Sequence, residues 1–371
     1  MNQESNKKAK APRTMMQRHM MLLCSILVIV GLSFALPFTG LLFTDAAHAQ
    51  NQQEQGISDA QKGFGSDVNP RSNYWRAIRE GNAGISTVKS VDSNVLINPN
   101  GENWRAVRNG PVSYWGWIVI AVMAVAILLF ALLRGKVKVE GGMSGVKVKR
   151  WNGFNRFLHW VTAITFILLS ATGLALFYGK AVFIPLLGKD AFASFALIAK
   201  NIHNYTGPVF SASLIILLLM LLGKNIPNGS DIKWFLKGGG LIGKGHPPAG
   251  FANGGEKVWY WLLATFGVAV ILTGLAINFL VDLTRDQSML ALTVHAIASF
   301  IVMAVALGHI YIGTLGTEGS LEGMTTGEVD LNWAQQHHDE WVADLQKDGK
   351  IATGNASGRE PPMGTAAAVG D

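Results

Sequence analysis

Blocks of apolar residues, each about the length of one helix, alternate with polar stretches from residue 112 onward. They run at approximately 112–133, 154–178, 200–223, 257–281 and 290–313. An α-helix needs ~20 apolar residues to cross the ~30 Å hydrocarbon layer of a membrane, so each block is long enough to span it. The pattern predicts an all-α membrane protein in which a transmembrane helix at 112–133 precedes a four-helix bundle at 154–315.

The N-terminus has a different arrangement, in which a polar and basic stretch precedes one more apolar run, from Met20 to Phe43. This run is followed by Ala47-His48-Ala49, which matches the small-residue pattern of a secretory cleavage site. We therefore expect residues 1–49 to be a signal peptide, with an uncleaved membrane anchor as the alternative. In either case the chain after residue 49 emerges on the outer side of the membrane.

Residues 50–111 are polar and contain an internal repeat. Trp-Arg-Ala-Ile-Arg-Glu-Gly at 75–81 recurs as Trp-Arg-Ala-Val-Arg-Asn-Gly at 104–110. We expect a small extracytoplasmic (periplasmic) module that serves as a docking surface for a partner. The alternative is a structural tryptophan packed under solvated arginines, and docking is favoured because ~60 residues make a poor independent core.

Composition supports the membrane assignment and excludes several other classes. The chain is 49% hydrophobic and 15% charged, against ~25% charged in an average soluble domain. Its net charge is +7, but the basic residues border apolar blocks instead of forming an aromatic-rich patch, so we expect no nucleic-acid partner. The single cysteine, Cys24, excludes a disulfide framework, an iron–sulfur cluster and a cysteine-based zinc site within this chain.

The distribution of lysine and arginine predicts the orientation, because cytoplasmic connections carry an excess of them. One side carries Arg134, Lys136, Lys138, Lys147, Lys149, Arg150, Lys224, Lys233, Lys237, Lys244 and Lys257. The opposite side carries Lys180, Lys189, Lys200 and Arg285. We therefore expect the linker 134–153, the loop 224–256 and the tail 316–371 to be cytoplasmic, in agreement with the signal peptide. Within the tail, 331–347 is expected to form one amphipathic helix.

Histidines within the apolar blocks carry the strongest chemical signal: His159, His203, His295 and His309. His295 and His309 are 14 residues apart, which on a helix is ~21 Å of rise and only ~40° from four whole turns. Both side chains therefore lie on one face, near opposite edges of the membrane. The predicted orientation matches the depth of His203 to that of His295 on the outer side, and of His159 to that of His309 on the inner side.

Two neutral imidazoles from two helices can hold one heme iron and fill its coordination sphere, which favours one-electron transfer. The four histidines are therefore predicted to be the metal ligands of two b-type hemes stacked across the membrane. For a single intramembrane histidine, the alternative is a hydrogen-bonded interior residue or a proton relay. Depth-matched pairing of all four favours heme.

Two further residues are candidates for heme contacts. Gly173 lies 14 residues after His159, so it shares that face and reaches the depth of the outer heme, where a missing side chain leaves room for porphyrin. Arg156 precedes His159 by three residues and could pair with a heme propionate. The alternatives are ordinary small-residue packing for Gly173 and snorkelling to lipid phosphate for Arg156.

Three stretches resemble the cytochrome b (gamma) subunit of membrane-bound formate dehydrogenases, and the resemblance covers about 150–345. They are Asn155-Arg156-Phe157-Leu158-His159-Trp160, the loop Pro247-Pro248-Ala249-Gly250 with Asn253-Gly254-Gly255-Glu256-Lys257, and the tail Met324-Thr325-Thr326-Gly327-Glu328-Val329-Asp330 with Trp333-Ala334, His337-His338 and Trp341. The histidine set is shared with hydrogenase cytochromes, whereas the loop and the tail are more specific.

This resemblance implies a three-subunit formate:quinone oxidoreductase in the bacterial inner membrane. An alpha subunit with molybdopterin or tungstopterin would oxidise formate outside, and an iron–sulfur beta subunit would pass electrons to the outer heme. This chain would be the electron-transfer and quinone-reducing subunit, delivering electrons from the inner heme to menaquinone or ubiquinone, with protons taken up near the cytoplasm. The family's quinone pocket corresponds here to Asn253, Gly254 and His309, although the chain has Glu256 where glutamine is usual.

Two alternative functions remain open from the sequence. One is the cytochrome b subunit of a nickel–iron hydrogenase or of another periplasmic oxidoreductase. The other is a heme-free transporter or anchor, which the lack of acidic residues in mid-membrane disfavours. The adjacent His337 and His338 are expected to form a polar or partner-contacting surface, because adjacent side chains diverge on a helix and cannot share a metal.

Overall fold

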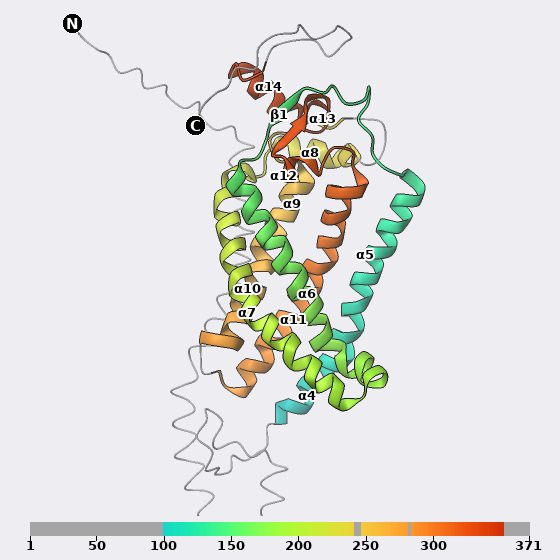
Figure 1. The fold of residues 1–371 in the computed structure, drawn as a ribbon, viewed down its shortest axis with the longest axis vertical. Coiled ribbons are helices and arrows are strands. Elements are labelled where there is room, and N and C mark those ends of the chain that lie inside the picture. The colour runs from blue at the N-terminus through green and yellow to red at the C-terminus, as the bar shows by residue number, and fades with distance from the viewer. Residues whose placement is uncertain (1–98, 241–245, 281–282, 352–371) are drawn as a thin grey trace, which may run out of the picture.

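The computed structural model describes residues 99–240, 246–280 and 283–351. Long helices run side by side, and a small folded cap made of the linker and the tail closes one end (Figure 1). The predicted signal peptide, 1–49, and most of the predicted module, 50–111, lie outside the described residues.

Five helical spans within the described residues are long and apolar enough to cross a membrane, which confirms the predicted all-α membrane fold. The bounds of their elements are α4 Pro99–Val107, η2 Arg108–Val112 and α5 Ser113–Arg134; α6 Gly153–Leu187; α7 Lys189–Leu221 with η3 Leu222–Lys224; α9 Gly254–Leu262, η5 Leu263–Gly267, α10 Val268–Leu275 and η6 Ala276–Leu280; α11 Arg285–Tyr311 with η7 Ile312–Gly316.

The second and third spans extend well beyond the apolar blocks that predicted them. The connection expected at 179–199 is helical, and the chain reverses at Gly188 alone, where φ is +80°. At 35 residues, α6 is ~52 Å long and outreaches a ~30 Å hydrocarbon layer. Lys180 and Lys189 interrupt the apolar pattern, but neither prevents a helix from continuing into water. Packing of Phe192 against Gly179 holds the extension together.

The bundle is built from neighbours in sequence plus one helix added outside it. α6 pairs with α7, α10 packs on both α7 and α11, and α5 packs along α11. A buried cluster of Phe210, Leu214, Leu218, Tyr260 and Ile271 joins the third and fourth spans. On the outer surface of α5, Leu132 and Leu133 are 73% and 86% exposed, as expected for side chains that contact lipid.

The cap is formed by the linker and the tail, two segments that were predicted to be separate. Strand β1 (Lys147–Lys149) pairs antiparallel with β2 (Glu328–Asp330), and Val148 lies opposite Val329. The other elements at this end are α8 Gly229–Leu236, η4 Gly238–Gly240, α12 Glu322–Thr325, α13 Leu331–His337 and α14 Asp339–Lys347. Val148, Val329, Trp333, Trp341 and Val342 form the buried core of the cap. The linker and the tail as far as residue 351 therefore form one folded unit.

The prediction of a single helix over 331–347 is wrong, because the helix breaks at His338, whose backbone is not helical (φ −149°, ψ 50°). His338 is 1% exposed, and its Nδ1 lies 2.8 Å from the carbonyl oxygen of Gly250, to which it donates. A surface role for His338 is therefore also wrong, and His337 is half-buried. A hydrogen bond between residues 88 positions apart leaves no trace in local periodicity.

Arg150 joins the cap to the fourth span. It is 6% exposed, pairs with Glu256 at 3.1 Å and donates to the carbonyl oxygen of Phe251 at 2.8 Å. The guanidinium carbon lies between 5.2 and 5.8 Å from the ring centres of Trp151, Phe251, Trp333 and Trp341. A cation in such an aromatic setting is stabilised by the ring faces as well as by its carboxylate.

The free energy of unfolding of the cap should fall in acid because of His338. Burial, with a contribution from the nearby Arg150 cation, lowers the pKa of His338 to about 3 from its ordinary value of 6.5. Below pH 6.5 the unfolded chain takes up a proton that the folded cap excludes, so stability is lost as pH falls from 6.5 toward 3. The loss reaches about 2 kcal/mol by pH 5. This loss of stability is measured by hydrogen exchange at the Val148 and Val329 amides, with the rates corrected for intrinsic exchange.

The matched control is His338→Asn, whose amide can still donate to Gly250 but cannot titrate near pH 6. This variant should flatten the pH dependence of cap opening. A slope as steep as that of the wild type would contradict the assignment to His338.

Candidate functional site: two histidine pairs in the bundle

The four intramembrane histidines form the two pairs that depth matching predicted. The ring centres of His203 on α7 and His295 on α11 are 6.2 Å apart, with planes inclined at 68°. Those of His159 on α6 and His309 on α11 are 6.3 Å apart, inclined at 56°. Because α11 is continuous from Arg285 to Tyr311, the two pairs are separated by ~21 Å along it.

The gap within each pair has the size of one shared metal ion. A metal–imidazole bond is ~2 Å long, and the ring centre lies ~1 Å behind the bonded nitrogen. Two imidazoles on opposite sides of one ion therefore place their centres ~6 Å apart, which matches both pairs. No cluster of three or more His, Cys, Asp or Glu ligands exists among the described residues. Each pair therefore offers two imidazole ligands, and any further ligands of a metal held there would have to come from a bound group.

Hydrogen bonds to threonine orient the outer pair. Thr172 Oγ1 lies 3.0 Å from His203 Nδ1, and Thr273 Oγ1 lies 3.0 Å from His295 Nδ1. Each hydroxyl donates its own proton to the carbonyl oxygen four residues earlier, at 2.7 Å, so its oxygen accepts from the Nδ1–H of the histidine. His295 Nδ1 also faces the carbonyl oxygen of Val270 at 3.1 Å. This tautomer leaves Nε2 with a free lone pair for a metal.

A glycine follows each threonine and lies against the same ring. A Cβ added to Gly173 would be 3.2 Å from His203 Cε1, and one added to Gly274 would be 3.0 Å from His295 Cε1. Gly173 therefore lies at the depth of the outer pair, as predicted. The glycine leaves room for the imidazole ring, and the predicted room for porphyrin stays a prediction. The contacts of the two threonines with these histidines were not predicted. The signal that could have indicated them is the Thr-Gly dipeptide, which occurs on both α6 and α10.

Aromatic rings surround the inner pair in place of hydroxyl groups. Trp259 stacks on His309 with ring centres 5.0 Å apart and planes inclined at 17°, and Trp160 packs edge-on against His159 at 5.5 Å. His159 Nδ1 is buried and has no hydrogen-bond partner among the described residues. An indole face against an imidazole excludes water from that side of the pair.

A turn of the tail contacts α6 next to His159. Trp160 Nε1 donates to the carbonyl oxygen of Met324 at 3.0 Å, and Arg156 Nη1 donates to that of Thr325 at 2.5 Å. Arg156 Nε is buried and unpaired within the described part of the chain. A cation with one buried donor unused can bind an anionic group, and the contact of Arg156 with a heme propionate stays a prediction.

Asn253 has a structural role in addition to its predicted place in the quinone pocket. It caps α9: its side-chain oxygen accepts from the backbone N–H of Glu256 at 2.9 Å, and the Glu256 carboxylate accepts from the backbone N–H of Asn253 at 2.9 Å. This reciprocal capping box fixes the start of the helix that carries Trp259, six residues later. Asn253 and Gly254 therefore lie at the end of the bundle that holds the inner pair.

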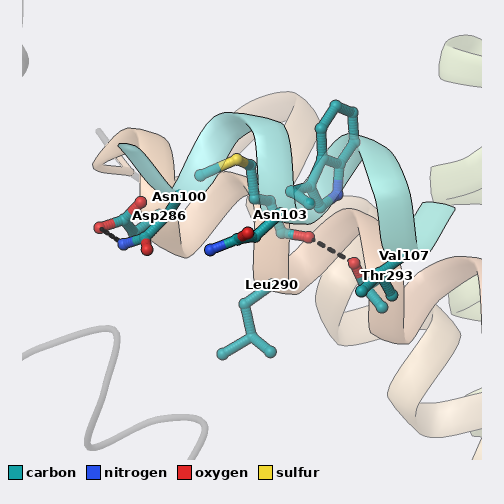
Figure 2. Close-up of a pocket in the computed structure, with 8 residues that line it drawn as sticks. Asn100, Asn103, Val107, Asp286, Leu290 and Thr293 are labelled. Carbon is teal, nitrogen blue, oxygen red and sulfur yellow. Dashed lines mark hydrogen bonds between the residues drawn. The ribbon is translucent and has the colours of Figure 1, made fainter. Parts of the chain in front are cut away.

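A cavity of about 330 Å³ opens at the other end, between α4 and α11, as Figure 2 shows. Its lining includes Trp104, which begins the second copy of the repeat, and Thr293, two residues before His295. Asn100 Nδ2 donates to Asp286 across its edge at 3.3 Å. Arg108 from the same repeat copy donates to the Phe177 carbonyl oxygen at 3.1 Å. The second copy of the repeat therefore packs against the bundle beside the outer pair, while the docking role of 50–111 stays a prediction.

Comparison with known proteins places this geometry in a family. The sequence model described as Prokaryotic cytochrome b561 matches residues 150–327. The chain is 30% identical over 198 residues to the formate dehydrogenase cytochrome b556 subunit of Haemophilus influenzae, covering 50% of this chain and 78% of the relative. It is 25% identical over 206 residues to the nitrate-inducible cytochrome b556(Fdn) subunit of Escherichia coli K12 formate dehydrogenase, covering 54% and 92%. The matching figures for the cytochrome b556(fdo) subunit of the same organism are 27% over 205 residues, covering 54% and 94%.

The threonine contacts give a direct test of the outer pair. Thr172→Val keeps the shape of the side chain but removes the oxygen that accepts from His203 Nδ1–H, so we expect heme to bind there about 10–100-fold more weakly. Thr172→Ser restores the acceptor and should bind normally. Heme titration of the purified protein, followed by its absorbance, measures the difference. Equal affinities for the valine and serine variants would show that the hydroxyl does not orient His203.

Proposed function

Since this chain belongs to the prokaryotic cytochrome b561 family, we propose that it is the membrane cytochrome b subunit of a formate dehydrogenase complex. The proposal rests on the two histidine pairs, whose ring centres are 6.2 and 6.3 Å apart, at two depths of one bundle. The names of the relatives favour formate dehydrogenase over the hydrogenase alternative. The pairing of all four histidines is unexpected for a heme-free transporter.

His203 with His295, and His159 with His309, are proposed to hold one b-type heme each. Heme b held by such a pair of imidazoles would supply a centre that accepts and gives one electron at a time. On the outer side, Thr172 and Thr273 keep both Nε2 atoms available for iron. At the inner site, Trp259 keeps the His309 ring in place and excludes water, and Arg156 offers its unpaired Nε to a propionate.

The complex requires an entry point and an exit point for electrons. We propose that an iron–sulfur subunit docks at the end that carries His203 and His295, and that a subunit with molybdopterin or tungstopterin oxidises formate beyond it. Quinone reduction would take place at the opposite end, with Asn253, Gly254 and His309 lining the pocket. The Asn253 side-chain oxygen accepts a hydrogen bond in capping α9, so the NH2 group of this side chain remains to donate to a quinone carbonyl.

The orientation and the boundaries follow from the same proposal. We place the chain in the bacterial inner membrane with the His159–His309 end toward the cytoplasm, where the connections rich in lysine and arginine lie. The predicted limits of the signal peptide, the periplasmic module and the bundle remain proposals. The folded cap then faces the cytoplasm, where protons for quinone reduction are available.

His309→Ala tests the number of hemes and the role of the inner pair together. The wild-type complex should contain two b hemes per chain by pyridine hemochrome assay. The variant should contain about one, because His159 alone cannot hold iron from both sides. Formate-dependent quinone reduction should fall to background, while formate oxidation with an artificial dye should persist.

His246→Ala is the matched control, because His246 lies at the cap end of the bundle, where its exposed Nε2 is 2.9 Å from Glu140 Oε2. It should retain two hemes and quinone reduction. A purified wild-type chain without heme, or a His309→Ala variant that retains both hemes, would refute the proposal.

A further inference from the structure

Helix α8 has an inner face that fixes it to the start of the fourth span. Asp231 on α8 pairs with Lys257 on α9 at 2.8 Å, and their side chains are 13% and 6% exposed. Trp234 packs on the first turn of α9 so closely that a Cβ added to Gly254 or Gly255 would be 2.9 Å from the indole. Asn228 caps α8 with a reciprocal bond to Asp231. The helix is therefore held in one orientation.

A second side of α8 is apolar and exposed. Ile232, Phe235 and Leu236 are 51%, 52% and 82% exposed. At ~100° per residue they occupy one arc of ~100°, next to the arc that carries Asp231 and Trp234. Between the third span and α8, Leu222 at the end of the span and Ile226 in the connection are also 43% and 47% exposed.

The third arc of α8 is cationic. Lys233 and Lys237 are exposed and lie ~40° apart, beyond Leu236 on the helix circumference. Asp231 is neutralised by Lys257 on the inner face, so the charges that α8 turns outward are positive. In Figure 1, α8 lies across the long helices at the cap end of the bundle, near the start of α9.

We infer that α8 is an interfacial helix that binds anionic phospholipid. The arc of Ile232, Phe235 and Leu236 inserts into the acyl boundary beside the third span, and Lys233 and Lys237 reach the phosphates above it. An apolar face flanked by lysine is the arrangement with which helices lie in a membrane surface. Exposed apolar side chains also connect the end of the third span to α8, as at Leu222 and Ile226, which favours lipid over a protein partner. This inference does not depend on heme or quinone.

A fluorescent label tests contact with lipid. Bimane is attached at Leu236→Cys in the complete complex, with Cys24→Ser removing the chain's own cysteine, and the complex is reconstituted into vesicles. Brominated lipid should quench this label strongly, while iodide in the buffer should not. A label at Lys347→Cys on α14, whose side chain is 77% exposed, should respond in the opposite way.

A second comparison tests the preference for negative charge. In vesicles of equal phosphatidylglycerol and phosphatidylcholine, bromine is placed on one lipid and then on the other. The local ratio of the anionic lipid, read from quenching at position 236, should exceed the bulk ratio about five-fold. It should return to the bulk ratio in Lys233→Ala/Lys237→Ala but not in Lys347→Ala/Lys350→Ala.

Each other outcome overturns the inference. Quenching at position 236 by iodide would place α8 in water, and protection from both quenchers would mean that a protein partner covers it. Lipid contact with no preference for the anionic lipid, or a preference that survives in Lys233→Ala/Lys237→Ala, would remove the lysines from the interaction. Heme content serves as the folding control, so a misfolded variant is recognised before quenching is compared.

Discussion

The spacing between facing imidazoles is the constraint on which the rest of the bundle depends. Two neutral rings ~6 Å apart gain little from one another, and imidazole nitrogens in apolar surroundings lose hydration, a cost that a group bound between the rings can offset. Both gaps are nonetheless closely similar, although the rings come from three different helices. Since α11 contributes one ring to each pair, the length and continuity of this helix set the separation of the two sites.

The two pairs are maintained by different physical means. The outer pair is oriented by hydrogen bonds from an adjacent helix. The threonine of a Thr-Gly dipeptide binds each ring, and the glycine leaves space for it. The inner pair uses tertiary packing, with Trp259 from the fourth span against His309 and the turn at 324–325 closing over Arg156 and Trp160. The outer site therefore depends on the bundle alone, whereas the inner site also depends on the fold of the tail.

This difference explains which features the sequence could predict. The spans and the pairing of His203 with His295 follow from apolar periodicity, helical rise and loop charge, which are local quantities. The break at His338 and the pairing of Val148 with Val329 depend on contacts between segments about 90 and 180 positions apart. No local pattern encodes such contacts. The role of Thr172 lay between these cases, since the Thr-Gly repeat was visible but its partner was not.

The cap also makes the inner site a meeting point of distant segments. Gly327 illustrates this: its carbonyl oxygen accepts from the backbone N–H groups of both Arg150 and Trp151 at 2.9 Å, and at φ +91° its backbone adopts a conformation that favours glycine. Arg150 in turn pairs with Glu256, whose carboxylate completes the N-terminal capping box of α9, the helix that carries Trp259. A change in the tail can therefore reach His309 through this chain of contacts. The threonine-bound outer pair, ~21 Å away along α11, lies outside it.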